Sequence, residues 1–140
     1  MELTLRITVR DPPAGVELML QRGRHDLEPA VRRARGALTF ELTARVEVRP
    51  GAPPRWLGPF VQGPPAARFV YVNAGTLAGQ PDSPWTRRAK VPLGAITAEL
   101  VERALAEGGL LEAEITASGR DGGPVSGTVP LRVGWRVAAR

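Results

Sequence analysis

The sequence contains no cysteine, a single histidine (His25) and few aromatic residues. Without cysteine the chain has no disulfide, no thiol nucleophile and no thiolate ligand for a metal ion. One imidazole is too few for a histidine-rich metal site. We therefore expect a protein that is stabilised by its hydrophobic core and that has no metal ligands and no cofactor.

Long apolar runs are also absent, and none approaches the roughly 18 residues that a membrane-spanning helix needs. Residues 1–6 alternate like a strand and do not form the basic and apolar regions of a secretory signal. These two absences predict a cytoplasmic protein without a membrane segment.

Negative charge is in deficit, because 14 Asp and Glu face 19 Lys and Arg, which gives a net charge of +5. A charge of this sign can steer acidic partners towards the protein. The arginines are spread along the chain instead of being clustered, so we attribute most of the excess to a compositional bias and not to a dedicated ligand.

Alternation of apolar and polar residues is the main structural signal. In residues 2–10, Leu3, Leu5, Ile7 and Val9 fall on one face and polar residues on the other, which is the period of a half-buried strand. The same reasoning predicts further strands at 16–22, 37–48, 67–73, 85–91, 110–118 and 128–138.

One helix is expected at about 97–107, with Thr97 as its N-cap and Gly108-Gly109 as its stop. The Arg-rich segment 23–36 has no apolar stripe and is expected to be a loop.

The length of the chain fits one domain, residues 1–140, which buries roughly two thirds of its unfolded surface. Strands with one apolar and one polar face are typical of antiparallel sheets. The fold class that follows is mainly β: an antiparallel β sandwich or a partly closed barrel of about seven strands with one α-helix.

Rare residue types gather between positions 58 and 93, where the only Tyr and the only Lys lie. Tyr71 and Asn73 share one face of the strand 67–73, and Arg88 and Lys90 share one face of the next predicted strand. If these strands are neighbours, the four side chains converge, and cationic groups beside a phenol and an amide suit a phosphate or a carboxylate. The predicted ligand-binding residues are Gln21, Gln62, Tyr71, Asn73, Arg87, Arg88 and Lys90.

A second interpretation of the same residues remains open at this point. In it, Phe69 and Tyr71 belong to the core and the arginines coat a sheet edge. Gly58 and Gly63 lie among prolines and match no phosphate loop, so they are expected to form a structural turn.

Nothing in the sequence indicates catalysis, and no catalytic residue is predicted. His25 lies between Arg24 and Asp26 in the predicted loop, and no nucleophile elbow surrounds any serine. Glu112 and Glu114 share the polar face of one strand, where we expect them to form surface salt bridges with the many arginines.

Three motifs carry a family resemblance: Gly58-Pro59-Phe60-Val61-Gln62-Gly63, Arg68-Phe69-Val70-Tyr71-Val72 and Arg87-Arg88-Ala89-Lys90. With them the chain resembles a family of small bacterial proteins known only as domain of unknown function 5990. The likeness extends from the first strand through Gln21-Arg22 to the turn at residues 121–124. Asn73-Ala74-Gly75 departs from the pattern, since a bulkier aromatic is expected before the glycine. The resemblance implies a compact single domain and supplies no catalytic residues.

These observations predict a binding module without enzymatic activity, whose partner is a small anionic ligand held around residues 58–90. The alternative is a protein-interaction or assembly module, in the form of a homodimer for example, with an exposed apolar patch or an unpaired edge strand. Single-stranded nucleic acid is a less favoured partner, because aromatic residues for base stacking are few.

Overall fold

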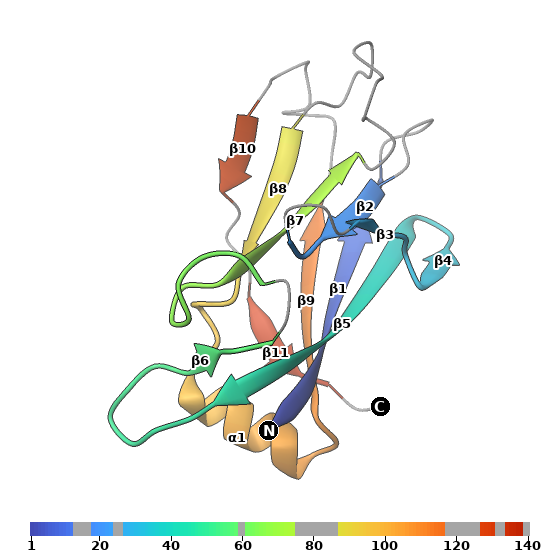
Figure 1. Cartoon of the computed structure of the whole chain (residues 1–140). Helices are drawn as coiled ribbons and strands as arrows, with labels where there is room; N and C mark the ends of the chain where they lie inside the picture. Colours follow the sequence, from blue (N-terminus) through green and yellow to red (C-terminus); the bar gives the residue numbers. More distant parts are fainter. Residues whose placement is uncertain are drawn as a thin grey trace.

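Eleven strands and one helix make up the described part of the computed structural model, which comprises residues 1–12, 18–23, 27–58, 61–74, 87–116, 127–130 and 134–138 (Figure 1). The elements are β1 (Glu2–Arg10), β2 (Leu18–Gln21), β3 (Leu27–Glu28), β4 (Arg32–Ala34), β5 (Ala37–Glu47), β6 (Arg55–Trp56), β7 (Phe69–Ala74), β8 (Arg87–Pro92), α1 (Ala98–Ala106), β9 (Leu110–Thr116), β10 (Gly127–Pro130) and β11 (Trp135–Val137). The predicted mainly β fold class with one helix is confirmed.

The strands form two sheets. The first has the order β11-β9-β1-β5-β4, with β6 also paired to β5, and the second has the order β10-β8-β7-β2-β3. Within the described residues neither sheet closes on itself, so the sandwich is the correct one of the two predicted architectures. Most ladders are antiparallel, but β1 with β9 and β8 with β10 run parallel.

One cluster of buried side chains lies between the sheets and explains the alternation in the sequence. β1 contributes Leu3, Leu5, Ile7 and Val9, each at most 1% exposed. The remaining long strands of both sheets also contribute their alternate residues, because successive side chains of a strand point to opposite faces. From the second sheet it receives Leu18, Leu20, Val70, Val72 and Val91.

The prediction of a loop over residues 23–36 is wrong in part. Residues 27–28 form β3, at one end of the second sheet, and residues 32–34 form β4, at one end of the first. Residues 24–26, and with them His25, lie outside the described residues. Edge strands of two or three residues bury no regular face, so no alternation marks them in the sequence.

The predicted strand 128–138 is in fact two strands in different sheets, since β10 pairs with β8 and β11 pairs with β9. Residues 131–133 lie outside the described part of the chain. The indole Nε1 of Trp135 donates a hydrogen bond to the carbonyl of Pro92 at 3.0 Å. This bond joins β11 to the end of β8, and so connects one sheet to the other.

The helix begins and ends where the sequence predicted. The Thr97 hydroxyl accepts a hydrogen bond from the Leu100 N–H at 3.2 Å, and Gly108 and Gly109 follow with φ of 114° and 80°. Val101 and Ala104 are buried against the first sheet, and α1 lies across the end of that sheet where β1 begins (Figure 1). Among the described residues, no helix has the length and apolar character that crossing a membrane requires.

Candidate functional site

The register of the second sheet brings three predicted site residues into one row. Gln21 of β2 lies opposite Tyr71 of β7, and Tyr71 lies opposite Lys90 of β8. Residues opposite one another in a ladder have their side chains on the same face. Since Val70 and Val72 are fully buried, this row belongs to the outer face of the sheet. The interpretation that places Tyr71 in the core is therefore wrong.

Phe69 and Gln62 extend this row along β7. The backbones of Gln62 and Phe69 exchange two hydrogen bonds, at 3.2 Å and 2.8 Å. Gln62 therefore lies opposite Phe69, as Gln21 lies opposite Tyr71. The rings of Phe69 and Tyr71 pack edge to face with centroids 5.2 Å apart. The Lys90 ammonium lies 4.1 Å from the centroid of the Phe69 ring. We call Gln21, Gln62, Phe69, Tyr71 and Lys90 the outer-face cluster.

The outer-face cluster carries a cation and no carboxylate. Lys90 is half-buried and forms no ion pair with any of the described residues. The Gln62 amide nitrogen is buried and has no hydrogen-bond partner in the described part of the chain. An ammonium without a carboxylate acceptor among the described residues is a group that an anion can satisfy.

The outer face of the first sheet is different, because its charges are paired. Arg136, Glu112, Arg6 and Glu41 lie in one row across β11, β9, β1 and β5. Glu112 contacts Arg136 at 2.6 Å and Arg6 at 3.4 Å, and Arg6 contacts Glu41 at 3.1 Å. Glu114 pairs with Arg10 at 2.7 Å. The predicted salt bridges of the two glutamates are thus confirmed, and the charges of this row largely balance one another.

This row makes stability depend on pH through Glu112. The hydrogen bond from Arg136 lowers the pKa of the Glu112 carboxyl below its ordinary value of 4.5, and Arg6 acts in the same direction against the effect of burial. A carboxyl whose pKa is lower in the folded state stabilises the fold above its unfolded pKa and loses this contribution as the pH falls through its folded pKa. We expect the free energy of unfolding to decrease from about pH 5 downwards.

Urea denaturation of the wild type and of Glu112→Gln over this pH range measures the effect. The variant should be less stable at neutral pH and should show a flatter pH dependence, while Glu99→Gln on α1 should leave the curve of the wild type unchanged. Parallel curves for Glu112→Gln and the wild type would contradict the assignment to Glu112.

Arg68 connects the first two sequence motifs. Its guanidinium donates from Nε to the Trp56 carbonyl at 3.0 Å and from Nη1 to the carbonyls of Val61, at 2.8 Å, and Gly63. No carboxylate of the described residues pairs with it. The guanidinium binds backbone carbonyls instead of a carboxylate. Arg68 thereby holds in place the segment before β7, and Gln62 is part of that segment.

The glycines of this segment are required by its backbone. Gly63 has φ of 90°, and a Cβ there would lie 2.6 Å from the Ala67 carbonyl oxygen. A Cβ on Gly58 would lie 2.8 Å from the backbone nitrogen of Arg45 in β5. Both contacts are shorter than van der Waals packing allows, which agrees with the predicted structural turn.

Three other predicted site residues are described by their backbone alone. Asn73 lies opposite Met19 of β2 and is two residues after Tyr71 in β7. Arg87 and Arg88 lie opposite Gly127 and Thr128 of β10. Arg88 is two residues before Lys90 in β8, and Arg87 is three residues before it. Most of the predicted loop 74–84 lies outside the described residues.

Phe69 is the cluster member that the predicted site omitted. In the sequence, Phe69 is two residues from Tyr71 and so shares its face of the strand. This spacing was the signal that could have identified Phe69 as a member of the cluster. Its role as the ring beneath the Lys90 ammonium depends on the pairing of β7 with β8, which the sequence does not show.

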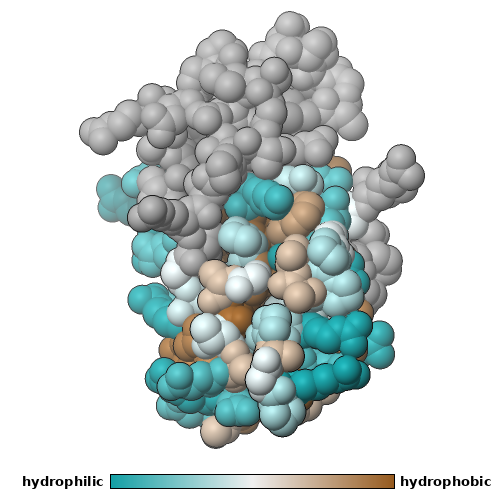
Figure 2. Space-filling model, turned by 90° about the vertical axis from the view of Figure 1, so that its left-hand side faces the viewer, coloured by the Kyte–Doolittle hydropathy of each residue, from teal (hydrophilic) through white to brown (hydrophobic). Residues whose placement is uncertain are grey.

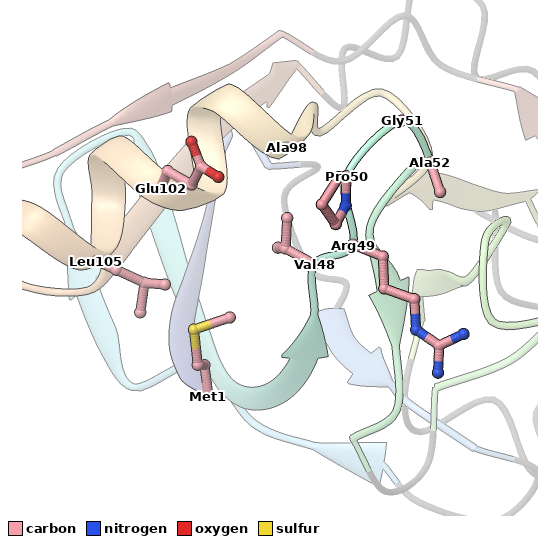
Figure 3. A pocket seen from close by; sticks show the side chains of 9 residues that line it. All are labelled: Met1, Val48, Arg49, Pro50, Gly51, Ala52, Ala98, Glu102 and Leu105. Atoms are coloured by element: carbon pink, nitrogen blue, oxygen red, sulfur yellow. The ribbon is translucent and has the colours of Figure 1, made fainter.

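A separate hollow of about 700 Å³ lies between α1 and the turn after β5 (Figure 3). Its walls are mostly apolar, and Glu102 contributes a carboxylate that pairs with none of the described cations. Arg49 on the rim is paired with Glu47 at 2.8 Å. Glu102 therefore brings an unpaired side-chain carboxylate to the hollow, which disfavours an anion beside it. It is lined by Met1, Val48, Arg49, Pro50, Gly51, Ala52, Ala98, Glu102 and Leu105, none of which belongs to the predicted site.

Among the described residues no group of three or more acidic or histidine side chains could hold a metal ion.

A family model described as a family of unknown function, DUF5990, matches residues 3–138. This is the family that the sequence motifs resemble. No curated protein and no solved structure matches the chain.

Proposed function

Because the chain belongs to the family of unknown function DUF5990, whose description names no activity, we propose its function from the geometry of the second sheet. The outer-face cluster is proposed to bind a small anionic ligand, a carboxylate or a phosphate, without catalysing a reaction. The cysteine-free composition is compatible with a cytoplasmic location, which remains part of this proposal.

The observation that carries the proposal is the unpaired Lys90 ammonium on the Phe69 ring. The ring holds the ammonium by a cation–π contact and leaves its N–H donors without a carboxylate acceptor among the described residues. Tyr71 and Gln21 lie in the same row and add a hydroxyl and an amide to this face of the sheet. The two aromatic rings supply apolar surface, which favours an anion with an attached ring or alkyl group.

The competing module for protein assembly finds less support. It predicts an exposed apolar patch or an unpaired edge strand. For the patch, the side of the molecule in Figure 2 shows small hydrophobic areas interspersed with hydrophilic ones over the described residues. The outer face of the first sheet is covered with paired charges.

A single lysine makes the test specific, because Lys90 gives the only lysine Cε signal in a ¹³C-lysine-labelled protein. We expect benzoate to shift this signal in a saturable way, and benzylamine, which has the same ring and the opposite charge, to leave it in place. Inorganic phosphate in the same titration separates a preference for phosphate from one for carboxylate.

Lys90→Gln is expected to weaken benzoate binding about tenfold or more, since it removes the charge but keeps a polar side chain of similar length. Isothermal titration calorimetry measures the affinity of this variant, and Arg103→Gln on α1 is the control with the same loss of charge. Equal affinity of Lys90→Gln and the wild type, with equal melting temperatures, would rule out the outer-face cluster as the site.

A further inference from the structure

The segment from β3 to β4 forms an exposed border of both sheets. β3 ends the second sheet and β4 ends the first, and only three residues separate them. All three residues of β4 are exposed, and β4 pairs with β5 on one side alone in the described part of the structure. Val31 between the two strands is 61% exposed, and Leu27 is 40% exposed. An outermost strand with apolar neighbours is a template on which another extended chain can pair.

Two exposed arginines of this border, Arg32 and Arg35, carry positive charge. Arg32 and Arg35 are exposed and form no ion pair with any described residue, in contrast to Arg6 and Arg136 on the outer face of the first sheet. Asp11 contacts the turn after β4, where its N–H donates to the Gly36 carbonyl at 2.9 Å. Glu28 of β3 is paired with Arg22, and Arg32 and Arg35 outnumber the carboxylate of Asp11, so the net charge of the described border is positive.

The charge decides which occupant the edge accepts. A second copy of the chain that paired β4 with β4 would bring like charges opposite one another, which destabilises a ladder. An extended segment with alternating acidic and apolar residues would instead place carboxylates against the arginines and apolar side chains near Val31. Oligonucleotides share the negative charge, but they cannot add a strand to the sheet through backbone hydrogen bonds.

We propose that β4 is a docking edge for an acidic, extended segment of a partner protein, which adds to the first sheet as a further strand. This surface is separate from the outer-face cluster, because β4 belongs to the other sheet. The two proposals can therefore fail independently.

Fluorescence anisotropy with a labelled peptide of alternating Glu and Val tests the proposal on the full chain. We expect saturable binding to the wild type and roughly tenfold weaker binding to Arg32→Glu/Arg35→Glu, as reversal of two exposed charges allows. Arg103→Glu/Arg49→Glu makes the same change of charge far from β4 and should retain the affinity of the wild type. A peptide with Lys in place of Glu should not bind.

Two further measurements separate docking on the edge from general attraction. In a ¹⁵N amide spectrum, bound peptide should shift the signals of residues 31–35 while those of α1 stay in place. Benzoate should not displace the peptide. Equal losses of affinity in the two double variants, or displacement of the peptide by oligothymidylate at lower concentration than by unlabelled peptide, would overturn the proposal.

Discussion

Arg68→Met is expected to lower the free energy of unfolding by about 4 kcal/mol, because three backbone carbonyls lose their charged donor at once. Hydrogen bonds to a charged group contribute about 1.5–3 kcal/mol each, and the three share one side chain, so their contributions are not additive. Methionine keeps much of the apolar stem, so the loss reports the guanidinium and not the packing.

Urea denaturation gives this free energy, and Arg55→Met is the matched control. Arg55 is partly exposed on β6 and contacts Glu47 at 3.3 Å. Exposed ion pairs contribute about 0.2–1 kcal/mol, so the control should lose no more than this. Similar losses in the two variants would mean that the carbonyls of residues 56, 61 and 63 do not depend on Arg68.

Gly63→Ala is expected to destabilise the fold by about 3 kcal/mol, of which the left-handed backbone accounts for about 1–2 kcal/mol. The remainder comes from the contact of 2.6 Å that the new Cβ would make with the Ala67 carbonyl oxygen. A carbonyl within a tight turn cannot move away as the end of a flexible side chain can.

Gly51→Ala separates these two contributions. Gly51 has φ of 74°, and no atom lies within 4 Å of the Cβ that alanine would add. It should therefore show the conformational part alone, about 1 kcal/mol. Chemical denaturation of the two variants measures the difference, and equal losses would contradict the close contact at Gly63.

These two residues explain why the motifs before and within β7 belong together. The first motif supplies carbonyls and glycines for a turn, and the second supplies the guanidinium that binds those carbonyls. The result is a fixed position for Gln62 beside Phe69. A ligand at the outer-face cluster would thus meet a site whose backbone is already ordered, which lowers the entropic cost of binding.

The tests of function and stability can be read separately. Lys90 is half-buried on the outer face and contacts an aromatic ring, so its replacement by glutamine should change ligand affinity with little effect on folding. Arg68 contacts backbone, so its replacement should change stability first. A variant of Arg68 that bound benzoate normally once folded would show that the turn stabilises the protein without shaping the site.

Much of the fold followed from local pattern. The inward residues of β1, from Leu3 to Val9, were predictable because a strand with one buried face must alternate. The limits of α1 were predictable because a threonine cap and two glycines act on their own turn of backbone. The pairing of Glu112 with arginine was foreseen from its place on a polar strand face in a basic chain.

Only the tertiary structure decided which strands are neighbours. Alternation states which side of a strand is buried, but a parallel ladder such as β1 with β9 joins segments about a hundred residues apart through contacts that leave no local signal. For the same reason, the sequence could place Tyr71 beside Lys90 only on the condition that their strands are neighbours, and the order β2-β7-β8 met that condition and added Gln21 to the row. The sequence alone determined the residue types of the candidate site, and the pairing of distant strands determined that they meet on the outer face of a sheet and not in the core.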